Sequence, residues 1–496
     1  MALKIRIAVI SDLHAADQRH KPVSRGDMAD TLLLRVLHRL NRWIKPDVTV
    51  LLGDLTHIAS AESTRNHLQK LSRVVDQLQS PSIVLPGNYD ANDPTFYSFF
   101  KNPDDFIDIK GFGFLPFIDQ YVWPRHAYRP EYNLRRMKIA RSNFDGPIIS
   151  LQHVCLFPPE THDCPYNYVN AEQIISAMRK YNICLAISGH VHEGLELIQS
   201  DKVAFTATAA LYKSPFCFQV IDIDNSNSGS VNIKTTAHRL RLPESSSLVD
   251  CHIHTPMAYC SENLEMLKII GLADDFNLAG CAFAEHSSSL YLSRTQRDRN
   301  EHFHKGIDAA QPENYRVDQY IQMLKKFNCP ADSIALEIDC DQRGRAMLDD
   351  ADRSKFRFLI GSIHELSENL KPEPDYETFC QQYLCQLDHL IKSGVKVLAH
   401  PWRIFRLAGL EPDEKVFRSA IEKLSKNNVA SELNFHHFDP PEQFVQMCLD
   451  AGVKFTLASD AHNLRAVGEL WPHLQLLEKI NYNGDLADIL IDPRIP

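Results

Sequence analysis

The sequence predicts two α/β domains in one chain of 496 residues. In the first half, strand-like apolar runs alternate with segments of helical periodicity, which is typical of layered α/β folds. A second series of the same kind follows the segment RLPESSSL (241–248), whose Pro, Glu and Ser residues are typical of a linker. Polar residues follow the apolar runs in both series. We therefore expect one domain over residues 1–243 and another over 248–496.

Strands and helices alternate along the first domain. The first five elements are expected to be a strand at IRIAVI (5–10), a helix at 27–44, a strand at VTVLL (48–52), a helix at 62–79 and a strand at SIVLP (82–86). Residues 98–145 are rich in Phe, Pro and Arg and have no regular period, so we expect a long insertion or cap near a site there. IISLQH (148–153) and CLAISGH (184–190) resume the strands.

The first domain ends in strand-like runs with no helix between them. These runs are FTATAA (205–210), FCFQVIDI (216–223) and VNIKTTAHRL (231–240). Consecutive strands without crossover helices predict an antiparallel sheet that closes the domain. The polar run NSNSGS (225–230) is expected to be the tip of a hairpin.

Seven apolar runs in the second domain carry polar residues at their ends. They are VDCHIH (249–254), AGCAFAEH (279–286), SIALEID (333–339), FRFLIGSIH (356–364), VKVLAHP (395–401), VASELNF (429–435) and VKFTLASDAH (453–462). Helical stretches such as 376–394 and 414–427 separate them. Strand-helix repetition of this kind is typical of a βα barrel, whose active site lies at the C-terminal ends of the strands.

The composition limits the class of function. Hydrophobic residues make up 44% of the chain and charged residues 23%, which is ordinary for a soluble globular protein. The formal net charge of -10 argues against long nucleic acids as partners, whereas a small phosphate ester can still bind in a metal-lined pocket. The start MALKIRIAVISDLH has no signal-peptide layout, so we expect a cytoplasmic protein without a membrane partner. The 12 cysteines are scattered singly, which indicates neither a disulfide framework nor a zinc ribbon. No feature of the sequence indicates an oligomeric state.

Five strand ends in the first domain carry oxygen and nitrogen ligands. They read SDLH, GDLTH, GNYD, LQH and SGHVH, and they supply Asp12, His14, Asp54, Asn88, His153, His190 and His192. Strand ends of an α/β sheet converge at one edge, so these side chains can meet although they are far apart in the sequence. A carboxylate shared by two divalent cations, with histidines and an amide, suits Mn, Fe or Zn and the hydrolysis of phosphate esters.

This set of motifs resembles that of the calcineurin-like metallophosphoesterases over roughly residues 5–240. The resemblance implies a four-layer α-β-β-α sandwich that holds two metals. It assigns Asp12, His14, Asp54 and His192 to one metal, and Asp54 as the bridge with Asn88, His153 and His190 to the other. His57 and His162 lie outside the family's positions, and we expect them to be solvated or supporting.

GNYD (87–90) departs from the family at one position. Asn88 is the expected amide ligand, and Asp90 would orient its neighbour. The family commonly has His at position 89, where it steadies the transition state or protonates the leaving oxygen, but this chain has Tyr89. A phenol with an unperturbed pKa of about 10 is a weaker general acid than imidazole at neutral pH.

The motifs of the second domain resemble those of the PHP family, named for polymerase and histidinol phosphatase, over about residues 248–475. The resemblance implies a distorted (β/α)7 barrel around a cluster of up to three metals. Its ligands would be His252, His254, Glu285, His286, Glu337, His364, His400, Asp460 and His462. Glu337 would be the bridge, and His286 would serve the third metal.

Two positions differ from the residues usual in the PHP family. Glu285 stands where the family often has Asp. After the His-x-His pair, TPMAYCSEN offers Cys260 or Glu262 where the family often has His or Asp. We favour Glu262, because a carboxylate suits a hard metal cluster better than a thiolate does.

Arginines near the strand ends of the second domain are candidates for binding a substrate phosphate. Arg403, just after AHPW, is expected to contact the phosphate bidentately. The same role is open to Arg343 and Arg345. Glu432 lies at another strand end, where we expect a structural role.

Two phosphoesterase sites on one chain predict a bifunctional metal-dependent hydrolase. The first site would open a phosphodiester, and the second would strip the monoester product of a small nucleotide-like or other substrate. Two alternatives stay open: a nuclease or nucleotide-processing enzyme of defence or repair type, and a chain in which one domain is catalytic and the other is an interaction scaffold. Substrate specificity is expected in the irregular stretches 98–145 and 287–330.

Overall fold

The computed structural model describes residues 3–19, 21–57, 62–90, 93–122, 126–162, 166–225 and 231–495. Residues 226–230 of the expected hairpin tip (225–230) lie outside the described residues. The chain divides into two compact units, Met1–Arg241 and Leu242–Pro496, and each is described by itself. In the described part of the chain, no helix is long and apolar enough to cross a membrane.

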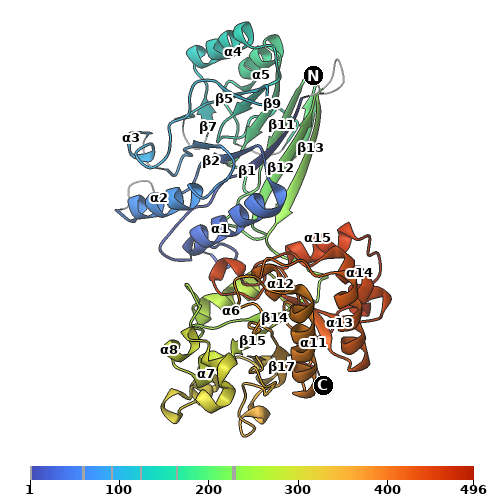
Figure 1. Ribbon diagram of the computed structural model, residues 1–496. Helices are drawn as coiled ribbons and strands as arrows, with labels where there is room; N and C mark the ends of the chain where they lie inside the picture. Colours follow the sequence, from blue (N-terminus) through green and yellow to red (C-terminus); the bar gives the residue numbers. More distant parts are fainter. Residues whose placement is uncertain are drawn as a thin grey trace. The chain divides into compact units, whose positions relative to one another are not determined.

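The first unit contains two β-sheets packed face to face (Figure 1). The first sheet has the order β13-β12-β1-β2-β3, with β1 Lys4–Ile10, β2 Val48–Leu52, β3 Ser82–Leu85, β12 Cys217–Asp224 and β13 Asn232–Arg239. The second sheet has the order β10-β11-β9-β8-β5-β4, with β4 Ile107–Ile109, β5 Phe112–Pro116, β8 Ile148–Leu151, β9 Ile183–Ser188, β10 Leu195–Ser200 and β11 Val203–Ala207. β1, β2 and β3 run parallel, as do β5, β8, β9 and β11. Within each sheet, the carboxyl ends of these strands therefore meet at one edge.

A hydrophobic core lies between the two sheets of the first unit. Every residue of β2 is buried, and β1 is exposed only at Lys4 and Arg6. Val50 of the first sheet belongs to the same buried cluster as Phe114 and Ile149 of the second. Such near-continuous apolar runs are typical of strands covered on both faces.

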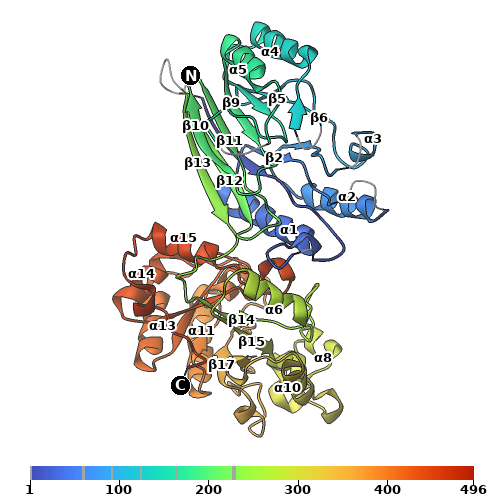
Figure 2. The same cartoon turned by 180° about the vertical axis from the view of Figure 1, so that it is seen from behind.

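Helices cover the outer faces of both sheets (Figure 2). α1 Ala29–Arg39 and α2 Glu62–Val75 lie over the first sheet, and α4 Glu131–Asn143 and α5 Ala171–Lys180 lie over the second. A π-helical segment, Leu40–Ile44, completes the helix predicted at 27–44, and a short α3 spans Asp93–Phe96. Met137 of α4 and Ile174 of α5 belong to the same buried cluster as Ile148 of the second sheet. The predicted four-layer α-β-β-α sandwich is confirmed.

The stretch 98–145 is more regular than the sequence predicts. It contains β4, β5 and α4, and β5 lies between β4 and β8 inside the second sheet. A separate two-stranded ribbon, β6 Gln120–Val122 and β7 His126–Tyr128, follows β5. β4, β6 and β7 have 3 residues each, which is too short to show a period.

The last strands of the first unit differ in part from the single antiparallel sheet that the sequence predicts. β12 and β13 are antiparallel and join the first sheet beside β1, as expected. β11 instead joins the second sheet, parallel to β9 and antiparallel to β10. The sequence did not predict β10, most of whose residues are exposed or half-buried and therefore lack an apolar run.

Seven parallel strands form a barrel in the second unit. They pair in sequence order and are β14 Val249–Ile253, β15 Gly280–His286, β16 Ile334–Ile338, β17 Phe358–Gly361, β18 Val397–Leu398, β19 Ala430–Asn434 and β20 Phe455–Ala458. The barrel nearly closes where β14 meets the residues after β20. There the Asp460 N–H donates to the His252 carbonyl at 2.9 Å, and the His254 N–H donates to the Ala461 carbonyl at 3.2 Å. The predicted (β/α)7 barrel is confirmed.

Helices follow the strands of the barrel. They are α6 Met266–Asp275, α7 Ser287–Tyr291, α8 Arg294–Asp298, α9 Glu301–His304, α10 Val317–Lys326, α11 Tyr376–Lys392, α12 Arg403–Leu407, α13 Glu414–Lys426, α14 Glu442–Asp450 and α15 Trp471–Lys479. α13 shows why they form: Asp413 caps its first turn by accepting from the Val416 N–H at 2.9 Å. Its buried residues, spaced three or four apart, form one apolar face. α7, α8, α9 and α10 fall in the stretch 287–330 that was expected to be irregular.

Candidate metal centres

The strand ends of the first unit bring together all seven side chains that the sequence singled out as ligands. Asp12 and His14 follow β1, Asp54 follows β2, Asn88 follows β3, His153 follows β8, and His190 and His192 follow β9. Both sheets therefore contribute ligands to a common site. Asn88 and His192 are half-buried, and the other five are buried.

One group of nitrogen and oxygen atoms forms around Asp12. Nε2 of His192 lies 3.4 Å from Asp12 Oδ1, and Nε2 of His14 lies 3.7 Å from the same oxygen. The two imidazole nitrogens are 3.3 Å apart. Asp12, His14 and His192 thus form a cluster of the size that holds one metal ion.

A second group forms around His153. Its Nε2 lies 3.2 Å from Asn88 Oδ1, 3.4 Å from Asp54 Oδ2 and 3.1 Å from His190 Nδ1. Asp54 Oδ2 also lies 3.6 Å from His14 Nε2, so one carboxylate oxygen faces both groups. This is the position that a bridging carboxylate requires.

Buried atoms in both groups fit divalent cations. Asp12 Oδ1 and His190 Nε2 are buried and have no hydrogen-bond partner among the described residues. Leaving such atoms unsatisfied is costly, and a cation would satisfy them. Nδ1 of His153 lies 2.5 Å from the Leu52 carbonyl, to which it donates, so that Nε2 presents its lone pair to the site.

Burial and neighbouring charges shift the pKa values of two of these histidines in opposite directions. Burial lowers the pKa of His153, but the Asp54 and Asp12 carboxylates outweigh it and raise that pKa to about 10. Burial and the neighbouring His153 lower the pKa of His190 to about 4. Clustered groups with strongly shifted pKa values are typical of functional sites.

The backbone at this edge is strained. Asp12, His14, Asp54 and His190 have φ angles of 55°, 45°, 50° and 68°. A residue other than glycine at positive φ carries a penalty on the order of 1–3 kcal/mol, and such strain is concentrated at functional sites. Gly53 and Gly87 allow the two loops to meet, because a Cβ on Gly53 would lie 2.4 Å from the Gly87 nitrogen.

Asp90 holds these loops together. Its carboxylate accepts from the N–H groups of Gly87 at 2.8 Å, Thr56 at 2.9 Å and Leu55 at 3.2 Å. Burial and the Asp54 charge raise the pKa of Asp90 to about 6. Asp90 therefore positions the loops that carry Asp54 and Asn88.

The Tyr89 ring lies beside the first group. Its backbone N–H donates to Asp54 Oδ1 at 2.8 Å. Its ring is 5.1 Å from the His14 ring between centroids, and the His57 ring stacks on it at 5.7 Å. His57 therefore supports the aromatic wall of the site, whereas His162 packs against Phe157.

Sequence reasoning missed Tyr212 in this site. Its ring lies 4.5 Å from the His14 ring, and its hydroxyl lies 3.4 Å from His192 Nδ1. A proton on Nδ1 can be donated to the Tyr212 oxygen, which leaves His192 Nε2 as the ligand atom. Tyr212 follows β11 in a loop that no sequence pattern marks.

The second unit gathers its polar side chains around Glu337 of β16. Five imidazole nitrogens face its carboxylate: those of His286 at 2.5 Å, His400 at 3.1 Å, His364 at 3.5 Å, His252 at 3.6 Å and His254 at 3.8 Å. Burial raises the pKa of Glu337, but His286, His252 and His364 outweigh it and hold that pKa well below the usual range. Glu337 is thus an ionised carboxylate at the centre of the cluster.

Asp460 and His462 extend the cluster on one side. Asp460 Oδ1 lies 3.0 Å from His254 Nε2 and 3.5 Å from His462 Nδ1. The His254 ring is 4.2 Å from those of His286 and His462 between centroids. Groups that could each hold a metal ion are His252–His254–Asp460, His286–Glu337–His364 and His254–His286–His462.

Buried atoms again fit cations, and supporting carboxylates orient the ligands. Nε2 of His252 and Nε2 of His364 are buried without a hydrogen-bond partner among the described residues. Glu432 lies 2.9 Å from His252 Nδ1 and accepts from the His400 N–H at 3.0 Å. Asp339 accepts from His364 Nδ1 at 2.8 Å. The contacts to Nδ1 of His252 and of His364 turn Nε2 of each ring toward the cluster.

Glu285 and Glu262 lie at the edge of this set. Glu285 accepts from the Thr255 hydroxyl at 2.6 Å and is 3.6 Å from His254 Nδ1. Glu262 is exposed and accepts from Asn463 Nδ2 at 3.2 Å. Burial and the Glu285 charge raise the pKa of Cys260 to about 12. Ligation by Glu285 or Glu262 remains a prediction.

Two family models match the chain. Calcineurin-like phosphoesterase matches residues 5–194, and PHP domain matches residues 250–436. The chain is a calcineurin-like phosphoesterase domain fused to a PHP domain. Both families are metal-dependent phosphoesterases, so the chain is a metal-dependent hydrolase of phosphoric esters. No curated protein matches its sequence at a significant level.

Several solved structures are similar to one half of the chain. A dimetal phosphatase from Danio rerio is 13% identical, with 46% of this chain and 98% of that chain covered and a TM-score of 0.35. The purple acid phosphatase PPD1 from yellow lupin is 12% identical, with 47% and 51% covered and a TM-score of 0.34. The Listeria monocytogenes protein hisK, assigned as a histidinol phosphatase, is 15% identical, with 45% and 99% covered and a TM-score of 0.34.

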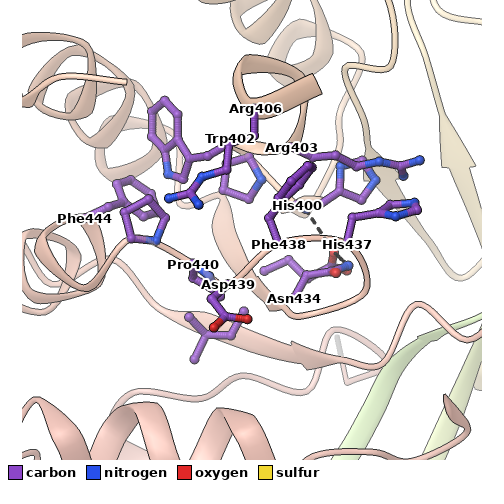
Figure 3. Close-up of a pocket in the computed structure, with 14 residues that line it drawn as sticks. His400, Trp402, Arg403, Arg406, Asn434, His437, Phe438, Asp439, Pro440 and Phe444 are labelled. Atoms are coloured by element: carbon purple, nitrogen blue, oxygen red, sulfur yellow. Dashed lines mark hydrogen bonds between the residues drawn. The ribbon is translucent and has the colours of Figure 1, made fainter. Parts of the chain in front are cut away.

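Arg403 of the PHP domain lies in a pocket beside His400. The pocket is lined by Trp402, Phe438 and Phe444 among others. Figure 3 shows the Arg403 guanidinium and the His437 ring extending in the same direction. Arg403 Nε is buried and has no partner among the described residues.

The other two candidate arginines differ from Arg403. Arg345 pairs with Asp341 and with Asp308, both at 2.8 Å. The Arg343 backbone N–H donates to Asp341 Oδ1 at 2.9 Å. Arg345 is therefore engaged in holding a turn, whereas Arg403 lines the pocket beside His400.

Proposed function

We propose that the calcineurin-like domain is a dinuclear phosphodiesterase and that the PHP domain is a trinuclear phosphomonoesterase. The substrate would be a small nucleotide-like or other phosphodiester, and the two domains would act on it in sequence. One observation carries the proposal: each domain holds its own cluster of buried ligands around a shared carboxylate, Asp54 in one and Glu337 in the other.

Different residues of the first domain would have different roles in diester cleavage. Asp54 and Asp12 supply negative charge, and Asn88 with the four histidines completes two ligand sets. Divalent cations held there would supply Lewis-acid charge and lower the pKa of a bound water. Tyr89, whose ring lies beside that of His14, would donate a hydrogen bond to a substrate oxygen.

In the PHP domain, Glu337 and the surrounding histidines would hold a second set of cations. Arg403 would bind the phosphate of the monoester. Burial lowers the pKa of His364, but the Asp339 and Glu337 charges outweigh burial and the nearby Arg403 charge and raise that pKa above its usual value. Arg403 lines the same pocket as His400, one of the expected ligands, and this proximity supports a role in binding the phosphate.

The order of the two reactions follows from their chemistry. Hydrolysis of a phosphodiester yields a monoester and an alcohol. A monoester is the substrate of the second site. The products of a monoesterase are an alcohol and inorganic phosphate, which a diesterase does not cleave. Diester cleavage therefore comes first in this proposal.

Two synthetic esters test it. Wild type, Asp54→Asn and His400→Ala are assayed with Mn on bis-p-nitrophenyl phosphate and on p-nitrophenyl phosphate, with release of nitrophenol and of phosphate followed. We expect Asp54→Asn to stop diester cleavage and leave monoester cleavage intact. His400→Ala should stop only monoester cleavage.

Two results would contradict the proposal. If one substitution abolished both activities and the other neither, a single domain would be the enzyme toward simple esters. If the metal content of the purified protein matched one cluster alone, the other domain would be a scaffold.

A further inference from the structure

A cavity of about 690 Å³ adjoins the proposed diesterase centre. Asn88 and Asp90 line one side of it. The other side comes from the segments 102–105, 116–121 and 132–136, which lie in the stretch that the sequence marked as an insertion. Pockets of roughly 300–1,000 Å³ are typical for small ligands. A diester bound at Asn88 therefore has room for one of its two arms here.

The far wall of the cavity is fixed to the metal-site loops. Asp119 Oδ2 accepts from the Val154 N–H at 2.7 Å, and Val154 follows His153 directly. The other oxygen of Asp119 accepts from the Tyr168 hydroxyl. Arg129, buried behind this wall, donates to Tyr168 at 3.0 Å and to Gln152 at 3.1 Å. These hydrogen bonds join the cavity wall to the loop that carries His153, so the cavity belongs to the same site.

The charged side chains that line the cavity are already compensated. Arg136 pairs with Asp105 at 3.1 Å and donates to the Pro116 carbonyl at 2.9 Å. Asp90 and Asp119 accept from backbone N–H groups, as described above. Among the described residues that line the cavity, the carboxylates of Asp90, Asp105 and Asp119 outnumber the guanidinium of Arg136, so the lining disfavours a second phosphate. The arm that enters should therefore carry no phosphate of its own.

Aromatic and amide groups make up the rest of the lining. Tyr121 is 40% exposed and Tyr132 is 58% exposed, and both line the cavity. Gln120 donates to the Tyr132 hydroxyl at 3.1 Å, and Asn102 lies in the same lining. Exposed aromatic rings bind planar groups by stacking, and amides bind polar ring edges by hydrogen bonds. A nucleobase has both features.

We propose that this cavity binds the nucleoside arm of the diester, with its base against Tyr121 and Tyr132. The substrate class is then a nucleoside phosphodiester whose only phosphate lies at the metal ligands. This inference rests on the proposed diesterase activity and names the class of substrate for which that activity would be specific.

Two substrates with the same leaving group test the inference. Thymidine 5′-(p-nitrophenyl phosphate) carries a nucleoside arm, whereas methyl p-nitrophenyl phosphate carries only a methyl group. We compare the ratio of kcat/KM for the two in wild type, Tyr121→Ala, Tyr132→Ala and the double variant. Tyr128→Ala is the matched control, because Tyr128 is 39% exposed on the same ribbon and lies outside the cavity lining.

Wild type should prefer the nucleoside ester, and the double variant should lose about tenfold or more of that preference through a higher KM. The methyl ester should be cleaved at the wild-type rate by all the variants, which also shows that they are folded. An unchanged ratio, or an equal loss on both esters, would overturn the inference and leave the diesterase standing.

A second readout applies if wild type cleaves neither ester, in which case the proposed diesterase fails. Binding of thymidine is then measured by ligand-observed NMR on wild type, the double variant and Tyr128→Ala. Binding that only the double variant loses would support the nucleoside cavity, and binding that all three share or all three lack would overturn it.

Discussion

Asp339 accepts a hydrogen bond from His364 Nδ1 at 2.8 Å, on the ring opposite the nitrogen that faces Glu337. Both Asp339 and Glu337 lie on β16 or directly after it, two residues apart. One strand end thus supplies the central carboxylate of the PHP cluster and the group that orients one of its histidines. Burial raises the pKa of Asp339, but the His364 contact outweighs it and keeps that pKa below the usual range.

Loss of the Asp339 carboxylate should therefore weaken the PHP cluster. In Asp339→Ala, His364 loses the partner that fixes its tautomer and ring position. Removal of such partners typically lowers metal affinity or activity by about 10–100-fold. We expect a drop of that order in kcat/KM on p-nitrophenyl phosphate and a weaker Mn dependence.

Asp339→Asn is the matched variant, because its amide oxygen can still accept from Nδ1. It should retain more activity than Asp339→Ala, and neither should change diester cleavage. Equal activity of all three proteins on the monoester would show that the hydrogen bond does not position His364.

Substitution of Tyr89 tests the departure from the family at the diesterase centre. Tyr89→His should raise turnover about tenfold or more on diesters with poor leaving groups, because imidazole is the better proton donor at neutral pH. A comparison of methyl phenyl phosphate with methyl p-nitrophenyl phosphate isolates proton donation to the leaving group. Phenolate is a poor leaving group that benefits from a proton, whereas nitrophenolate leaves without one. Tyr89→Phe is the control for the hydroxyl. A rate in Tyr89→His that is unchanged or lower on both esters would show that Tyr89 has another role.

The sequence predicted the fold class because the informative patterns are local. Apolar runs mark the buried parallel strands, and the ligand candidates stand within a few residues of their ends. Asp12, Asp54 and Glu337 could thus be singled out from short motifs. The regular elements between 98 and 145 were missed for two reasons. Strands of 3 residues such as β6 leave no period to detect, and the apolar residues of α4 do not lie on one face, since Tyr132 and Ile139 are exposed.

The supporting residues of the sites could not be predicted in the same way. Tyr212 contacts His192 only because β11 pairs with β9, which brings the loop after β11 next to the loop after β9. Asp339 was visible in LEID, yet its partner His364 lies on another strand end. Such contacts depend on tertiary packing, which a local pattern does not contain.

Arg403 should contribute to the affinity of the PHP site for a monoester. Hydrogen bonds to charged groups contribute about 1.5–3 kcal/mol, so Arg403→Ala should raise KM for p-nitrophenyl phosphate by about tenfold or more. Arg403→Lys keeps the charge and loses the bidentate geometry, so its KM should be intermediate. Arg345→Ala is the control for an arginine held by other partners. An unchanged KM in Arg403→Ala would remove Arg403 from the phosphate site.

His473 of α15 links two strand ends of the PHP domain. Its Nε2 lies 2.9 Å from the Leu433 carbonyl and 3.0 Å from the Ala458 carbonyl, and it donates to both. Burial lowers the pKa of His473 to about 4, whereas in the unfolded chain it should be about 6.5. Between pH 6.5 and pH 4, His473 is mostly protonated in the unfolded chain and mostly neutral in the folded chain. Stability therefore falls as the pH drops from 6.5 toward 4.

The expected loss from this group is about 2 kcal/mol between pH 7.5 and pH 5. His473→Gln isolates it, because a glutamine amide can donate to both carbonyls and does not titrate. Urea unfolding at pH 7.5 and pH 5 should show a drop in the free energy of unfolding that is about 2 kcal/mol smaller in the variant than in wild type. If both proteins lost the same amount, the neutral form of His473 would not be what the fold requires, and the loss would come from other groups such as His238, whose pKa burial lowers to about 4.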